Sequence, residues 1–251
     1  MYDPPGYLWA IVIAGITAIP AATCVVLYGG AVRGGLGRKR AALLAGGAAV
    51  LLGGWFTASA VIAGHGWYQA RLGHGVPWMP VAVVGFFGAL LALRRIPVVA
   101  RALAAPGMLS RLELPHSFRV VEGTAFLAVM ALGQLPALFA LPAGLGDIAA
   151  GIAAPLVALR LARGGGRRAA LRFNAFGMTD LVVALTLGAL CGFQLLNVTP
   201  SGAPISELPL ALIPTAAVPL LFALHITSVS ALRKAQRAPL PATAPLTAAA
   251  R

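Results

Sequence analysis

Charged side chains are scarce in this sequence. Only 10% of its 251 residues are Asp, Glu, Lys or Arg, and 59% are hydrophobic, whereas an ordinary soluble domain has about 25% charged residues. Too little polar surface is available to face water on all sides, which excludes a soluble globular protein. In lipid, only helices and closed barrels satisfy their backbone hydrogen bonds. Because the apolar runs are continuous and approach the roughly 20 residues of a spanning helix, the sequence predicts an all-α protein embedded in a lipid bilayer.

Seven apolar runs are separated by short basic or Pro/Gly-rich segments. They predict a single seven-helix transmembrane domain over residues 1–234. The expected spans are residues 8–31, 41–63, 78–93, 120–141, 147–161, 173–196 and 208–232. Residues 235–251 are rich in Pro and Ala, and we expect them to form a disordered cytoplasmic tail.

Basic residues fall almost entirely into alternate loops. Of the 19 Lys and Arg residues, 18 lie after the first, third and fifth runs or at the C-terminal end, and Arg71 alone lies on the other side. The positive-inside rule assigns the basic side to the cytoplasm, so the N-terminus is expected outside and the C-terminus inside. The net charge of +13 is thus explained by topology. No aromatic-rich basic segment accompanies it, so nucleic acid is not an expected partner.

Several cofactors and crosslinks lack the residues they need. Cys24 and Cys191 differ in expected depth by about ten residues, or roughly 15 Å, which exceeds the Cα separation of about 7 Å that a disulfide allows. Retinal is excluded because the last run contains no Lys for a Schiff base; Lys234 lies at its end. Of the four histidines only His225 is well inside a run, which argues against haem held by two histidines. No metal centre is predicted.

Ionisable residues inside the predicted spans are the strongest functional signal, because charge in a membrane is costly. Three polar residues at intervals of three lie around the start of the fourth run, which places them on one face of the helix that enters there. The sixth run begins with two more, and one lies about 10 Å from the inner end of the seventh. We expect these residues to meet in the cytoplasmic half, as a site for a substrate or a proton. They are His116, Arg119, Glu122, Asn174, Asp180 and His225.

This cluster has a second interpretation. Polar contacts between helices are common and contribute about 1 kcal/mol each, so the six residues could simply hold the bundle together. Asp147 is a separate feature, expected in the outer half at the start of the fifth span. A capping role at that helix N-terminus is favoured for Asp147 over an ion or ligand site.

Four motifs carry a resemblance to a family of uncharacterised bacterial multi-spanning inner-membrane proteins. The motifs are His-Ser-Phe-Arg-Val-Val-Glu (116–122), Leu-Pro-Ala-Gly-Leu-Gly-Asp (141–147), Phe-Asn-Ala-Phe-Gly-Met-Thr-Asp-Leu-Val-Val-Ala (173–184) and Leu-His-Ile-Thr-Ser (224–228). The resemblance covers residues 116–232. It implies a location in the bacterial plasma membrane and supplies no activity.

Three functions are compatible with these features. The first is a transporter of a small solute or of protons, with Glu122, Asp180 and His225 at its site and a water-accessible cavity beside them. The second is a sensor or assembly subunit that binds another membrane protein and packs its polar residues without a cavity. The third is an intramembrane enzyme for a lipid-like substrate, with His225 as base and Asp180 orienting it. No motif for catalysis is found, so the transporter is preferred.

Overall fold

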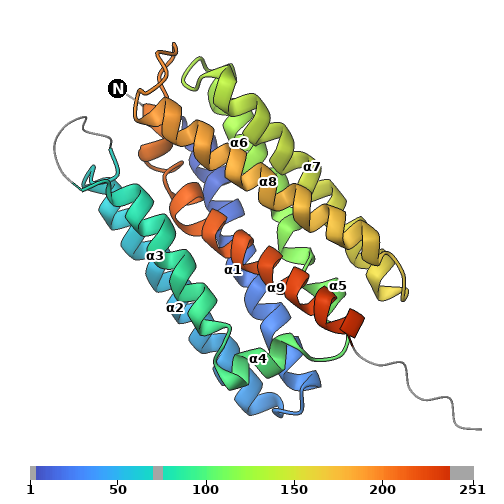
Figure 1. Ribbon diagram of the computed structural model, residues 1–251. Helices are drawn as coiled ribbons and strands as arrows, with labels where there is room; N and C mark the ends of the chain where they lie inside the picture. The colour runs from blue at the N-terminus through green and yellow to red at the C-terminus, as the bar shows by residue number, and fades with distance from the viewer. Residues whose placement is uncertain (1–3, 70–75, 238–251) are drawn as a thin grey trace, which may run out of the picture.

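The computed structural model describes residues 4–69 and 76–237, and all regular structure in these ranges is helical (Figure 1), which confirms the all-α class. Arg71, His74 and the predicted tail beyond residue 237 lie outside the described residues. The helices are α1 (Gly6–Arg33), α2 (Arg38–Gly64), α3 (Trp78–Leu93), α4 (Pro97–Leu103), α5 (Met108–Arg111), η1 (Leu114–Phe118), α6 (Arg119–Ala131), α7 (Ala137–Ala162), α8 (Arg167–Gly192), η2 (Ala203–Ser206), the π-helical η3 (Ile213–Ala217) and α9 (Val218–Arg237).

Within residues 4–69 and 76–237, five helical stretches are long and apolar enough to cross a membrane. They are α1, α2, α7, α8 and the combined η3–α9 segment Ile213–Ala235. The pair α3 and α4 adds a sixth if the two count as one span, although they meet at an angle of 85°. The chain is therefore a multi-pass membrane protein by length and hydropathy, while the seven-span count and the orientation stay predictions.

The boundary between the fourth and fifth predicted spans differs from expectation. α6 ends at Ala131, and α7 runs unbroken from Ala137 to Ala162. The turn between them uses Gly133, whose positive φ of 69° suits glycine, and Pro136 at the N-cap of α7. Pro142 lies in the second turn of α7, and the helix continues through it. The Pro/Gly motif at residues 141–147 is therefore helical and does not interrupt the helix.

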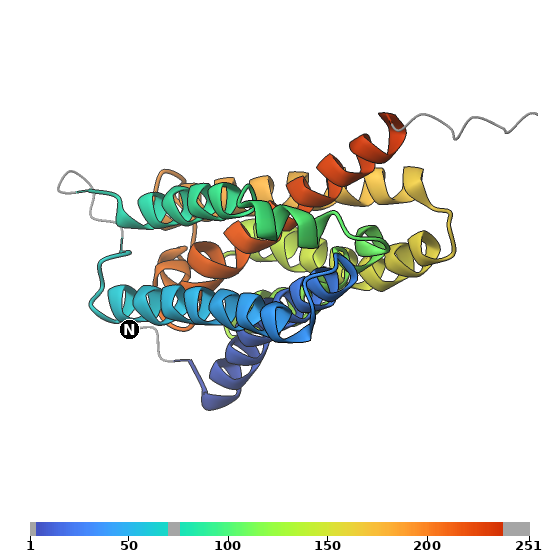
Figure 2. The ribbon, with the colours of Figure 1, turned by 90° about the horizontal axis from the view of Figure 1, so that it is seen from below.

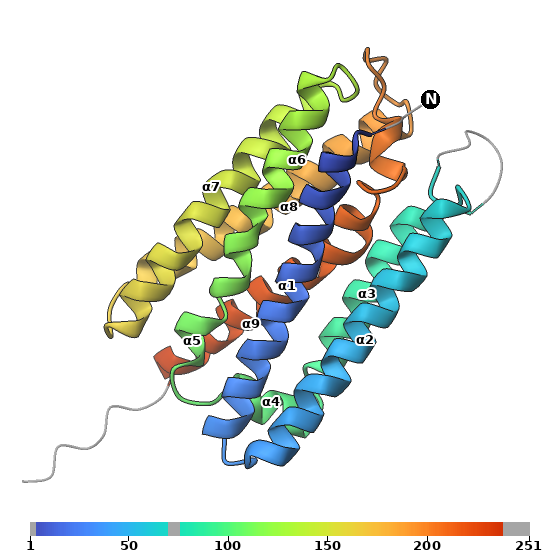
Figure 3. The same cartoon turned by 180° about the vertical axis from the view of Figure 1, so that it is seen from behind.

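The bundle has α1 and α9 between two groups of helices. Figure 1 shows α2 and α3 on one side and α6, α7 and α8 on the other, and Figure 3 shows α1 beside α6 from behind. In Figure 2, α1 (blue) and α9 (red) cross the neighbouring helices obliquely. The short helix α4 lies across one end of the bundle. This arrangement leaves η1, α6, α7, α8 and α9 to surround the polar interior.

The π-turn before α9 is fixed by polar contacts to α2. The indole Nε1 of Trp55 donates to the carbonyl oxygen of Thr215 at 2.9 Å. The hydroxyl of Ser59 lies 2.6 Å from the Thr215 hydroxyl and 3.1 Å from that of Tyr68. A π-turn interrupts the regular α-helical hydrogen bonds, and these side chains satisfy the polar groups at the interruption.

Both cysteines, Cys24 and Cys191, are free thiols, as predicted.

Candidate functional site

A buried guanidinium stands at the centre of the polar interior. Arg119, the first residue of α6, is completely buried. Its Nε donates to Oδ1 of Asp147 on α7 at 2.7 Å, and its Nη2 donates to Asp180 on α8. Glu122, one turn along α6, is also buried, and neither of its carboxyl oxygens has a hydrogen-bond partner among the described residues. Three helices are therefore joined through one side chain.

Asp147 has a different role from the predicted one. It lies in the interior of α7, ten residues after its first residue, so the interpretation as a helix cap is wrong. Its carboxylate is an ion-pair partner of Arg119. The prediction placed the start of the helix too late. The Pro/Gly motif at residues 141–147 is part of α7 and was expected to lie before it.

Two glycines make room for these contacts. A Cβ atom on Gly146 would lie 1.7 Å from Oδ1 of Asp180, so Asp180 reaches Arg119 over a bare stretch of α7. A Cβ atom on Gly177 would lie 2.3 Å from Nε2 of His225 and 3.2 Å from Nη1 of Arg119. Arg119, with its ion pairs, and His225 therefore both pack against Gly177.

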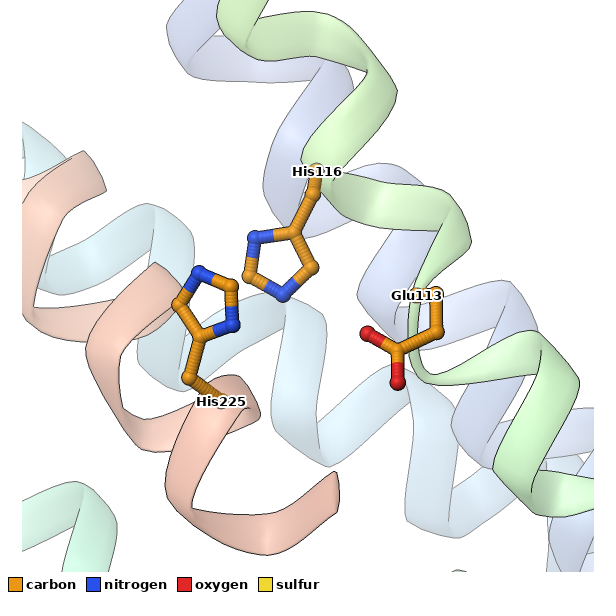
Figure 4. Close-up of side chains that lie close together, drawn as sticks. All are labelled: Glu113, His116 and His225. Atoms are coloured by element: carbon orange, nitrogen blue, oxygen red, sulfur yellow. The ribbon is translucent and has the colours of Figure 1, made fainter. Parts of the chain in front are cut away.

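A second polar group adjoins the first. Asn174 on α8 donates through Nδ2 to Oε1 of Glu113 at 2.9 Å, and its Oδ1 lies 2.8 Å from Nδ1 of His225. The hydroxyl of Ser228, one turn beyond His225 on α9, donates to the same Glu113 oxygen at 2.5 Å. The ring of His116 on η1 stacks on that of His225, with centroids 3.9 Å apart and an interplanar angle of 22°. Figure 4 shows Glu113 pointing toward the two rings.

The position of Glu113 makes its carboxyl unusual. It lies in the turn between α5 and η1, outside the candidate spans, and is completely buried. Burial raises the pKa of this carboxyl to about 7, and the hydrogen bonds from Ser228 and Asn174 act in the opposite direction. Near neutral pH both protonation states of Glu113 are therefore accessible.

All six residues of the predicted cluster line this interior, in two adjoining groups. Arg119, Glu122 and Asp180 belong to the ion-paired group, while His116, Asn174 and His225 belong to the histidine group. The pair required by the enzyme hypothesis does not form: Asp180 contacts Arg119 and His225 contacts Asn174.

Sequence reasoning missed Glu113 as a site residue. Glu113 precedes His116 by three residues, and the same interval separates His116, Arg119 and Glu122. This spacing was the available signal. Glu113 lies seven residues before the fourth predicted span, further from it than His116 and Arg119.

An apolar cavity of about 240 Å³ reaches the ion-paired group. Residues from α3, α7, α8, η2, η3 and α9 line it, with Phe126 of α6 and Tyr68. Asp147 is the only charged residue among the described residues that line the cavity. None of the six residues of the predicted cluster lines it. The cavity therefore touches the buried charges at Asp147 alone.

A family model described as "Domain of unknown function (DUF8737)" matches residues 76–233, more than half of the chain. The match includes every residue of both polar groups. No curated protein and no solved structure matches the chain.

Proposed function

The chain belongs to the DUF8737 family, and from the geometry of its interior we propose that it is a proton-linked transporter of small amines with an apolar body. The observation that carries the proposal is the position of Asp147. This one carboxylate faces the apolar cavity and is also bonded to Arg119. A solute bound in the cavity therefore meets the buried ion network at a single residue.

The chemistry of the cavity favours a cationic solute. Apolar side chains provide most of the lining, which suits a hydrophobic body. A protonated or quaternary amine would be attracted to Asp147, the only charged lining residue among those described. An anion would be repelled by the same carboxylate.

The charge balance of the interior favours coupling to protons. Glu122, Asp147 and Asp180 lie around one buried guanidinium, that of Arg119, and Glu113 adds a fourth carboxyl group in the adjoining histidine group. Unbalanced negative charge is costly inside a membrane, so protons or another cation must neutralise part of it. Binding of an amine at Asp147 supplies one positive charge and favours release of one proton, and loss of the amine favours its return.

The basic residues predict that the N-terminus lies outside and the C-terminus in the cytoplasm, and we propose the same orientation for the transporter. Seven segments cross the bilayer: α1, α2, α3, η1–α6, α7, α8 and η3–α9. The N-terminus is then outside and the cavity opens in the outer half. Support comes from the alternation of the basic loops and from Figure 3, where α6 runs alongside α1. The membrane is then the plasma membrane of a bacterium, as the resemblance implies.

The cavity also bears on the alternatives. A transporter was expected to have its cavity beside Glu122, Asp180 and His225, but the cavity adjoins Asp147 and none of these three residues. A sensor or assembly subunit was expected to have no cavity at its polar residues, and Asp147, which is bonded to Arg119, departs from that expectation. The intramembrane enzyme required Asp180 to orient His225, and these residues have other partners. The transporter is therefore the function that the arrangement supports best.

Proton flux in liposomes tests the proposal. The full chain is reconstituted with the pH-sensitive dye pyranine inside, and ethidium or tetraphenylphosphonium is added outside under a pH gradient. We expect each cation to accelerate dissipation of the gradient in the wild-type protein. Asp147→Asn should remove the acceleration, because it removes the negative charge that attracts the cation.

The matched control is Glu207→Gln, which removes a carboxylate that does not line the cavity. It should behave like the wild type. Wild-type liposomes that respond to neither cation, or an Asp147→Asn protein that responds as the wild type does, would overturn the proposal.

A further inference from the structure

Glu113, His116 and His225 have the donor set of a metal site. Each offers one ligand atom, and the three atoms lie within 4.8 Å of one another. Figure 4 shows the three side chains converging from η1, the turn before it, and α9. Two imidazoles and one carboxylate form the protein ligand set of many catalytic zinc sites and of non-haem ferrous iron sites.

These side chains have polar atoms that nothing satisfies. Among the described residues, Oε2 of Glu113, both ring nitrogens of His116 and Nε2 of His225 have no hydrogen-bond partner. All three residues are 0% exposed. A buried polar atom without a partner costs about 1–3 kcal/mol, so four in one place favour a bound ion that would satisfy them.

The surrounding residues hold the donors in place. Oε1 of Glu113 accepts hydrogen bonds from Ser228 and Asn174, which fixes the carboxylate plane and leaves Oε2 free. Asn174 also contacts His225, through its Oδ1. Residues that bond metal ligands in this way orient them and set the histidine tautomer.

The buried charge favours a cation here. The Arg119 guanidinium lies beside His225 at Gly177, but the two carboxylates paired with it, Asp147 and Asp180, exceed its single positive charge. Glu113 adds a further carboxyl beside the two histidines. We propose that Glu113, His116 and His225 bind a divalent transition-metal ion, zinc or ferrous iron. Metal–ligand distances of about 2.0–2.2 Å separate ligand atoms by about 3–4 Å. The three side chains would therefore draw together as the ion binds, and the stacked rings of His116 and His225 would turn so that one nitrogen of each points at the ion.

This inference does not depend on transport. The three proposed ligands are absent from the lining of the apolar cavity, and Asp147 is not among them. A metal ion here leaves coordination positions open, because three protein ligands do not complete a tetrahedral or octahedral shell.

Metal content of the purified full chain in nanodiscs is the first test. The protein is stripped with a chelator, incubated separately with Zn²⁺ and, without oxygen, with Fe²⁺, and then desalted and measured by mass spectrometry. We expect about one ion per chain from the metal that the site prefers. Either metal supports the site, and their ratio identifies the ion.

Substitutions locate the ion. His116→Ala and His225→Ala should each lower the affinity at least tenfold, and Asn174→Ala should lower it about 10- to 100-fold, because it releases both Glu113 and His225. The control is His65→Ala, which removes an exposed histidine at the end of α2. Retention of the ion by His116→Ala and His225→Ala would overturn the proposal.

A measurement on the wild-type protein covers variants that fail to fold. X-ray absorption at the edge of the bound metal reports imidazole ligands without any substitution. We expect two imidazoles per ion. A wild-type protein that retains no ion, or an ion with no imidazole ligand, would overturn the proposal.

Discussion

Gly177 of α8 leaves the space that the imidazole of His225 occupies on α9. A Cβ atom at Gly177 would lie 2.3 Å from Nε2 of His225, closer than any two non-bonded heavy atoms can approach. The absence of one methyl group therefore decides whether α8 and α9 pack at their observed separation. The space at Gly177 also allows His225 to lie beside Arg119 and to stack on His116.

Gly177→Ala tests this packing. Alanine normally stabilises a helix by about 0.5–1 kcal/mol relative to glycine, but here the clash with His225 should dominate and destabilise the protein by about 1–3 kcal/mol. Thermal unfolding in detergent, followed by circular dichroism, measures the change. Gly53→Ala is the matched control, since no atom lies within 4 Å of a Cβ there. Equal stability of the two variants would contradict the prediction.

Arg119→Gln should be among the most destabilising substitutions. It leaves Asp147 and Asp180 without their buried counter-charge, and breaking a buried ion pair typically costs about 3–5 kcal/mol. Adding Asp147→Asn to Arg119→Gln should restore part of the loss, because one uncompensated carboxylate is removed. Chemical denaturation of Arg119→Gln, Asp147→Asn and the double variant measures the coupling free energy between the two residues. Arg168→Gln, at an exposed position, is the control. Strictly additive effects would show that the ion pair contributes little.

The polar interior was partly predictable from sequence. Arg119, Glu122, Asn174 and His225 are buried, as expected of ionisable or amide groups within apolar runs, where burial is offset by mutual contacts. Counting residues along the helices predicted that they lie close to one another. It did not predict the division into two groups, because that division depends on which side chains face each other across α8.

Asp147 and Glu113 show where sequence reasoning stopped. Pro142, Gly144 and Gly146 suggested the end of a helix, but the two glycines allow close packing of helices. A Cβ atom on Gly144 would lie 2.8 Å from Leu127, and one on Gly146 would lie 1.7 Å from Oδ1 of Asp180. Glu113 enters the interior because α4 and α5 turn the chain back under the bundle, with Gly107 in a left-handed conformation at the N-cap of α5. The reversal itself leaves no pattern in the sequence, so the interval of three residues between Glu113 and His116 was the available signal.

The hydrogen bond from Trp55 to the π-turn gives a further prediction. Trp55→Phe removes the donor to the Thr215 carbonyl but preserves an aromatic ring to stack on Phe86, whose centroid lies 4.9 Å away. We expect a loss of about 1 kcal/mol, the usual contribution of one hydrogen bond. Thermal unfolding checks it against Trp67→Phe, which alters an exposed indole. A Trp55→Phe protein as stable as this control would mean that the carbonyl finds another donor.

The number of spans can be decided by labelling two loops. If η1–α6 crosses the membrane, the loops at Leu36 and Gly165 lie on the same, cytoplasmic side; if it does not, they lie on opposite sides. Leu36→Cys and Gly165→Cys are placed singly in a chain with Cys24→Ala and Cys191→Ala, and intact cells are treated with a membrane-impermeant maleimide. We expect both cysteines to react only after the membrane is permeabilised. Reaction of one but not the other in intact cells would reduce the count to six, because the basic loops would then no longer share a side and α6 would be a buried half-length helix of 13 residues.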